Sequence, residues 1–242
     1  VYDNVQNKDF LQVESGKLEV SFAGNIGNYD DMNIEATNSI TGEKIKKKDI
    51  EIIFVNNHFF SSLSEIIQTP KDFVLQNNIF SLAKDNELIL RSGNYFINKT
   101  IIIPENTKLR IKGKTKLTFA KDASLLSYSP ILTENNIGEL FSIDLNGGIF
   151  GIVNTKEKSI IKNCNISGGG KDIINGIHLT GMLSAYHSDI EIENCYIHDS
   201  IGDDAINVKY AKATIQNNQF KNILDDALDV DFAKEGSIII SN

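Results

Sequence analysis

The sequence predicts an all-β protein whose larger part is a right-handed parallel β-helix, a solenoid in which short strands stack coil upon coil. Three observations predict it. Short strands broken by turn residues follow one another over residues 77–242. One segment recurs at intervals of roughly two dozen residues, and such periods are typical of solenoids. A second segment, with alternating apolar and polar positions, recurs in step with the first.

The first part of the chain, residues 1–58, predicts a small β-sheet or sandwich domain ahead of the solenoid. Apolar and polar residues alternate there in three stretches, and the glycine–asparagine pairs between the first two favour turns. The alternating stretches are residues 17–22, 32–36 and 49–55.

Residues 59–76 are expected to form a short capping helix and a linker. Ser62 and Glu65 have the spacing of a capping box, and Pro70 is expected to end the helix. A solenoid needs its open end covered, because the apolar interior of the first coil would otherwise meet water. We therefore expect this helix to lie over the first coil.

The solenoid itself, residues 77–242, opens with strands that are short and evenly punctuated. Turn residues such as Gly93, Pro104 and Gly113 separate them and leave no room for helices. The expected strands are residues 87–90, 95–97, 101–103, 108–111 and 116–119.

The first repeat places asparagine and cysteine at one recurring turn. Residues 160–166, 191–197 and 214–220 superimpose, and a fourth copy begins at residue 238. A coil of roughly two dozen residues, with one insertion, accommodates three short strands and three turns. Cys164 and Cys195 occupy the same ladder position, and we expect them to fill the core as small apolar side chains rather than to form a disulfide.

The second repeat aligns residues 175–180 with residues 204–209 and 226–231. Its third and fifth positions are aliphatic and are expected to point inward, so the other positions point outward. One outward column is then His178, Asn207 and Asp229, and the next is Thr180, Lys209 and Asp231. The preceding turn adds further carboxylates from Asp203, Asp204, Asp225 and Asp226.

The insertion that lengthens one coil is expected at residues 182–188. It contains Tyr186 and His187, which could reach over the outward columns as an acid–base pair. The non-catalytic alternative is that Tyr186 packs against its neighbours and that His187 is an exposed surface residue.

Several stretches resemble a known superfamily. IENCYIHDSIGDDAINVKY (residues 192–210) and IQNNQFKNILDDALDVDF (residues 215–232) look like rungs of bacterial parallel β-helices of the pectate-lyase-like superfamily, and residues 93–125 look like their opening coils. The tract also resembles β-helical regions found beside spore-coat-kinase-like domains. The resemblance implies an extracellular or cell-surface location. The Gly-His-Gly motif of the superfamily's polygalacturonase-type hydrolases does not occur here.

The outward carboxylates suggest polysaccharide processing, by a lyase or epimerase acting on an acidic sugar polymer. Asp203, Asp226 and Asp231 could hold Ca²⁺, which would bind a uronate carboxylate and acidify the neighbouring proton. Lys209 with a lowered pKa, or His178, would take that proton, with Asp229 beside it. Hydrolysis is the other enzymatic option, with Asp204 paired with Asp226 or Asp229 as the two carboxyls.

The alternative is a non-catalytic surface, adhesion or scaffold module. Paired aspartates are ordinary turn residues, and outward strand positions are polar on any solvated face. Lys209 and Asp231 would then form a plain ion pair between coils. The absence of tryptophan removes the side chain best suited to stack on sugars, for an enzyme and a binding module alike.

Composition excludes some partners. The chain of 242 residues has a net charge of −8 and only two arginines, Arg91 and Arg110, which argues against nucleic acid. No apolar stretch of about 18 residues exists, so we expect no membrane span. The repeat breaks off near residue 242, and we expect its exposed edge to continue into further coils or to pair with another chain.

Overall fold

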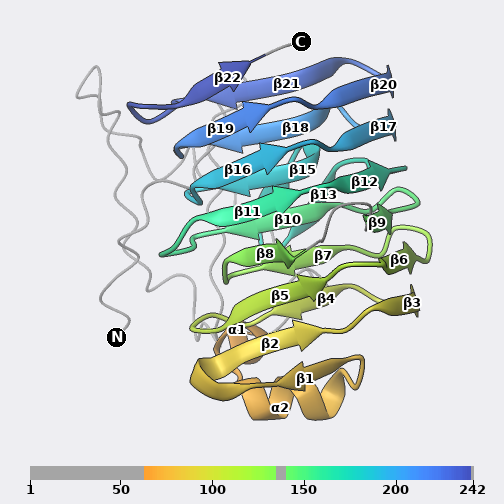
Figure 1. The fold of residues 1–242 in the computed structure, drawn as a ribbon, viewed down its shortest axis with the longest axis vertical. Helices are drawn as coiled ribbons and strands as arrows, with labels where there is room; N and C mark the ends of the chain where they lie inside the picture. The colour runs from red at the N-terminus through yellow and green to blue at the C-terminus, as the bar shows by residue number, and fades with distance from the viewer. Residues whose placement is uncertain (1–62, 135–139, 241–242) are drawn as a thin grey trace, which may run out of the picture. The chain divides into compact units, whose positions relative to one another are not determined.

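The computed structural model describes residues 63–134 and 140–240, which form a parallel β-solenoid of three stacked sheets (Figure 1). This confirms the predicted fold class. The β-domain predicted for residues 1–58 lies outside the described residues. No helix in the described part of the chain is long and apolar enough to span a membrane.

The first sheet has eight strands, which are parallel except for the antiparallel pair of β1 and β2. The strands are β1 (Phe80–Leu82), β2 (Glu87–Leu90), β5 (Lys108–Lys112), β8 (Ile131–Glu134), β11 (Ser159–Lys162), β16 (Ile190–Glu193), β19 (Ala213–Gln216) and β22 (Ile238–Ile240).

The second and third sheets have six parallel strands each. The second contains β4 (Ile101–Ile103), β7 (Leu125–Ser127), β10 (Phe150–Val153), β15 (Gly181–Tyr186), β18 (Asp204–Lys209) and β21 (Asp226–Asp231). The third contains β3 (Gly93–Ile97), β6 (Thr115–Phe119), β9 (Phe141–Asp144), β12 (Cys164–Ser167), β17 (Tyr196–Ser200) and β20 (Gln219–Ile223).

Two helices lie at the start of the described chain, α1 (Leu63–Ile67) and α2 (Pro70–Gln76). Pro70 does not simply end a helix, as the sequence suggested, but begins the second one, because its missing N–H is not needed in a first turn. The Thr69 hydroxyl caps α2 by accepting a hydrogen bond from the Asp72 N–H at 3.2 Å. Phe73 of α2 is fully buried against Phe80, so the end of the solenoid is covered by α2, which lies in the stretch expected to be a linker (Figure 1).

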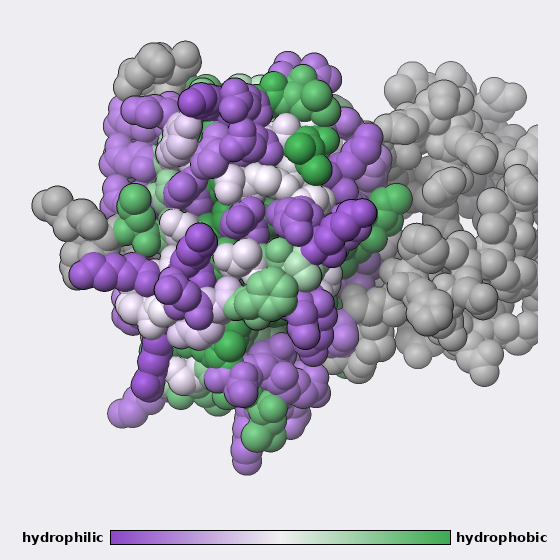
Figure 2. All heavy atoms as spheres, turned by 90° about the vertical axis from the view of Figure 1, so that its right-hand side faces the viewer, coloured by the Kyte–Doolittle hydropathy of each residue, from purple (hydrophilic) through white to green (hydrophobic). Residues whose placement is uncertain are grey.

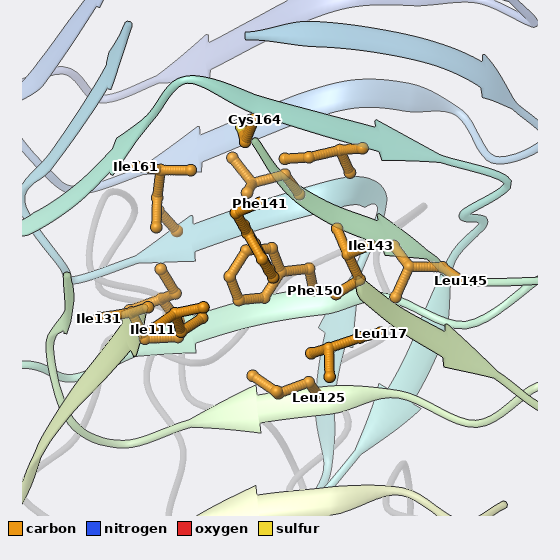
Figure 3. Close-up of a cluster of buried hydrophobic side chains, with 14 of the residues drawn as sticks. Ile111, Leu117, Leu125, Ile131, Phe141, Ile143, Leu145, Phe150, Ile161 and Cys164 are labelled. Carbon is orange, nitrogen blue, oxygen red and sulfur yellow. The ribbon is translucent and has the colours of Figure 1, made fainter. Parts of the chain in front are cut away.

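The interior is filled by apolar columns from all three sheets, as Figure 3 shows for its middle coils. In the second sheet, Leu125, Phe150, Leu183 and Ile206 face one another on successive strands, and all four are fully buried. Phe150 also meets Phe141 of the third sheet edge to face, with ring centroids 6.4 Å apart. Period-two alternation in each strand therefore becomes a continuous core.

The recurring asparagine turn is a backbone requirement. Asn163, Asn194 and Asn217 stand between the first and third sheets on successive coils, with φ of 50°, 55° and 56°. Asparagine tolerates this left-handed region better than most residues, which explains its recurrence at the turn.

The insertion is a hairpin and not the predicted segment 182–188. Strands β13 (Asp172–Ile174) and β14 (Ile177–Leu179) form an antiparallel pair that leaves the coil. Residues 181–186 form β15, which takes the place that we assigned to residues 175–180. A slip of six residues preserves period-two alternation, so the inward and outward pattern could not distinguish the two registers.

The hairpin covers part of the outward face of the second sheet. Ile174 and Leu179 pack there against Ile102, Leu126 and further apolar residues in a second hydrophobic cluster, separate from the interior. The second sheet is therefore buried on both faces where the hairpin covers it.

Cys164 and Cys195 form a disulfide between neighbouring coils, contrary to our expectation. Their Cα atoms are 4.6 Å apart, which lies within the range of about 4.4–6.8 Å that disulfides require. The reason is the stack itself, because equivalent residues of neighbouring coils lie roughly one strand spacing apart.

We predict that reducing this disulfide destabilises the solenoid. It closes a loop of 31 residues, and constraining the unfolded chain over such a loop stabilises a protein by about 3–5 kcal/mol. Guanidinium unfolding with and without dithiothreitol measures this, with Cys164→Ala/Cys195→Ala as the control that reductant leaves unchanged. Equal midpoints for oxidised and reduced wild type would contradict the prediction.

Candidate active site on the second sheet

The outward column of the second sheet changes from apolar to polar along the solenoid. Its members, matched by strand register, are Ile102, Leu126, Gly151, Ser184, Asn207 and Asp229. The hairpin packs over the apolar end of this column. The polar end therefore lies beside an apolar, water-excluding surface.

Two neighbouring columns bring more polar groups to the same place. Tyr186, Lys209 and Asp231 are in register on β15, β18 and β21. Asp204 and Asp226 are in register at the starts of β18 and β21. We call the group formed by Thr180, Asp204, Asn207 and Asp229 the Asp204–Asp229 cluster.

Asn207 is the centre of this cluster. Its side chain is fully buried, and its amide nitrogen donates hydrogen bonds to Asp204 Oδ2 at 3.0 Å and to Asp229 Oδ2 at 2.6 Å. Asp204 Oδ2 also accepts a hydrogen bond from the Thr180 hydroxyl at 3.1 Å. Within the described part of the chain, the Asn207 Oδ1 atom is buried without a hydrogen-bond partner. One amide thus holds two carboxyls together.

The two carboxyls both hold their protons more tightly than ordinary aspartates do. Burial, and then the negative charge of Asp229, raise the pKa of Asp204 despite hydrogen bonds from Thr180 and Asn207. Burial, and then the charge of Asp231, raise the pKa of Asp229 despite the nearby Lys209 ammonium. Two carboxyls in one partly desolvated place resist simultaneous ionisation, which is how acid–base pairs arise.

Lys209 does not have the lowered pKa that the sequence suggested for a proton acceptor. Its ammonium lies 3.3 Å from Asp231 Oδ2 and 5.6 Å from the centre of the Tyr186 ring. Burial lowers the pKa of Lys209, but the nearby Tyr186 and Asp231 outweigh burial and raise it. The predicted lowered pKa is therefore wrong, and a protonated lysine serves as a positive charge rather than as a base.

Tyr186 and His187 have different neighbours, although they are adjacent in sequence. Tyr186 is buried beside the cluster, with its hydroxyl 3.4 Å from Thr180 Oγ1, and burial raises its pKa. His187 occupies the turn after β15, with φ of 49°. Its ring stacks on Tyr210 at 4.8 Å, and Tyr210 stacks on Phe232 at 4.6 Å. Of this pair, Tyr186 is the residue that lies beside the cluster.

His178 is not in the column that we predicted for it. Ser184 holds the position next to Asn207, because β15 supplies this strand. His178 pairs with Ile173 on the hairpin, whereas its neighbour Leu179 is buried beneath it. Alternation along the strand therefore turns His178 away from the second sheet.

The three aspartates expected to hold Ca²⁺ are dispersed among other contacts. Asp203 lies 3.2 Å from the Lys171 ammonium, Asp231 pairs with Lys209, and Asp226 is exposed. Within residues 63–134 and 140–240, no three histidine, cysteine, aspartate or glutamate side chains are grouped closely enough to hold a metal ion. The calcium site stays a prediction from sequence.

Asn207 is the functional candidate that sequence reasoning missed. It stood in the predicted outward column between His178 and Asp229, yet only its neighbours were given roles. The signal was an uncharged amide that follows the aspartates of the preceding turn and lies next to Asp229 in its column. Comparison of the chain with protein-family models, with curated proteins and with solved structures finds no match.

We predict that Asp229→Asn stabilises the protein at neutral pH and has little effect at pH near 4. The folded-state pKa of Asp229 lies above its unfolded value, so its contribution to stability is complete below about 3.9. That contribution is lost as the pH rises through the raised pKa. An amide is neutral at every pH and escapes the loss.

The measurement is the thermal midpoint of Asp229→Asn minus that of wild type, followed from pH 4 to pH 7. The exposed neighbour Asp225 provides the control Asp225→Asn. If this difference in thermal midpoint does not change with pH, or is negative at pH 7, the surroundings of Asp229 do not favour its protonated form.

Proposed function

We propose that this chain processes a polysaccharide and that the Asp204–Asp229 cluster is its catalytic site. The observation that carries the proposal is the bridging of two carboxyls with raised pKa by the single buried amide of Asn207. Perturbed carboxyl pairs with a specific charge partner are typical of acid–base sites.

Hydrolysis of a glycosidic bond is the reaction that this pair supports best. Retaining glycoside hydrolases use carboxyls about 5–5.5 Å apart, and inverting ones need about 6.5–9.5 Å. The Oδ2 atoms of Asp204 and Asp229 accept hydrogen bonds from the same Asn207 nitrogen, at 3.0 and 2.6 Å. The distance between these two oxygen atoms therefore cannot exceed the sum of those two distances. This spacing favours the retaining reaction.

The roles follow from exposure and hydrogen bonding. Asp229 is the more exposed and, protonated, would give its proton to the glycosidic oxygen as that C–O bond breaks. Asp204, once ionised, would be held by the hydrogen bonds from Thr180 and Asn207 and would form an ester with the anomeric carbon. A water molecule, deprotonated by the Asp229 carboxylate, would then cleave the ester and restore both groups.

The charge of the site argues for a neutral polymer rather than the acidic one expected from sequence. Asp204, Asp226, Asp229 and Asp231 lie on this face, and its cation Lys209 is already paired with Asp231. A uronate chain would be repelled. Elimination or epimerisation would also need a base in the place of Lys209, whose raised pKa makes it unsuitable.

A non-catalytic surface or scaffold module is the second candidate, and one observation favours it. The hydrogen bonds of the cluster close largely on one another, through Thr180 and Asn207. A closed polar network of this kind also specifies strand register in a stack. The disulfide suits either function, because disulfides persist in oxidising places such as the cell surface.

The test is an assay of reducing ends released from a panel of neutral polysaccharides. Asp229→Asn and Asp204→Asn should each lower kcat by about a hundredfold to ten-thousandfold, the usual contribution of a positioned acid or base. Asp225→Asn serves as the matched control.

Unchanged turnover in both cluster variants would remove the catalytic assignment. Unsaturated uronate products, detected by ultraviolet absorbance, would restore the lyase expectation in place of hydrolysis. A wild-type protein that cleaves none of the panel would leave the non-catalytic module as the function.

A further inference from the structure

The outward face of the third sheet is polar on every coil from β6 to β20. Figure 2 views the solenoid from this side, where hydrophilic and intermediate side chains predominate. Two columns run along it in strand register. They are Lys116, Ser142, Asn165, Tyr196 and Gln219, and Thr118, Asp144, Ser167, His198 and Lys221.

A small pocket of about 130 Å³ lies in this face, across β6, β9 and β12. Side chains from both columns line it, together with the aliphatic Ile143, which lies between Ser142 and Asp144 in the sequence. The lining residues are Lys116, Ser142, Ile143, Asp144, Asn165 and Ser167. An ammonium, a carboxylate, two hydroxyls and an amide therefore line the same pocket.

These groups are not satisfied by one another. Over the part of the chain that the structure describes, the side chains of Lys116, Ser142, Asp144 and Ser167 form no hydrogen bond or ion pair. The first sheet behaves differently, because its outward charges pair across coils, as Lys162 does with Glu191 at 2.5 Å. Opposite charges on adjacent coils of the third sheet are left free for a ligand.

The next coil holds one wall of the pocket in place. His198 Nε2 lies 2.8 Å from Asn165 Oδ1, and His198 Nδ1 lies 2.6 Å from Asp199 Oδ2. Asp199 in turn accepts a hydrogen bond from Asn222 at 2.8 Å. The Tyr196 ring stacks on His198 with centroids 4.5 Å apart. Asn165 is thus oriented by a chain of contacts, which is how binding groups are preorganised.

We propose that this face binds a neutral saccharide chain, with one sugar seated in the pocket formed by Lys116, Ser142, Asp144, Asn165 and Ser167. Sugar hydroxyls both donate and accept hydrogen bonds, and the pocket offers donors and acceptors together. Its charges, Lys116 and Asp144, balance, so it selects no ionic ligand. Tyr196, one coil on, adds an aromatic ring beside the path. The polar columns continue along the axis, as a polymer requires.

This binding face is distinct from the Asp204–Asp229 cluster, because the two lie on different sheets. It would hold a polymer whether or not the cluster cleaves one. The proposal therefore stands or falls separately from the proposed hydrolysis.

The experiment titrates the full ¹⁵N-labelled chain with a β-linked glucose hexamer, a xylose hexamer and a galacturonate hexamer. Amide shifts should move in β6, β9 and β12 with at least one neutral hexamer. Asp144→Ala and Asn165→Ala should each weaken that binding at least fivefold, whereas the exposed-lysine control Lys99→Met should not. Unchanged thermal midpoints verify that the variants fold.

The Asp229→Asn variant separates the two sites. It should keep neutral-hexamer binding at β6, β9 and β12 even where it loses turnover. The proposal is overturned if neither neutral hexamer perturbs these strands, if shifts are confined to β18 and β21, or if the galacturonate hexamer binds more tightly than both neutral ones.

Discussion

Strand register between neighbouring coils is the constraint on which every other feature depends. Parallel pairing places each residue directly over its equivalent, roughly 4.8 Å away. Leu125, Phe150, Leu183 and Ile206 become one core column in this way. The same rule brings Cys164 to Cys195 and sets Asp204 over Asp226. A solenoid therefore turns each one-coil pattern into a column, whether that column is apolar, covalent or charged.

Columns of like charge repel one another and destabilise a solenoid, and the second sheet shows how this repulsion is reduced. Asp204 and Asp229 are partly desolvated and lie near further carboxylates, so both resist ionisation. Asn207, between them, donates to both and replaces part of the water that they lose. Packing and reactivity are linked here, because burial is the largest of the effects that move the two carboxyls away from ordinary aspartate behaviour.

The sequence predicted the stack but not every register in it. Short alternating strands and the recurring Asn turn at Asn163, Asn194 and Asn217 were sufficient for the solenoid, since both follow from local backbone rules. The alignment of residues 204–209 with 226–231 was also confirmed. The strand below them was misplaced, because residues 175–180 and 181–186 alternate alike. The disulfide and the raised pKa of Lys209 were missed, since each depends on distances between coils that spacing along the chain does not supply.

The position of the disulfide has a mechanical consequence. A solenoid pulled from its ends gives way coil by coil, because each coil contacts only its neighbours. The bond between Cys164 and Cys195 withholds the 31-residue segment between them from any such extension. That segment would lengthen by roughly 100 Å if it were released and stretched. The hairpin, Thr180 and β15 all lie within it, so the part of the chain that donates the Thr180 hydrogen bond to Asp204 is also the part that tension cannot draw out while the bond is intact.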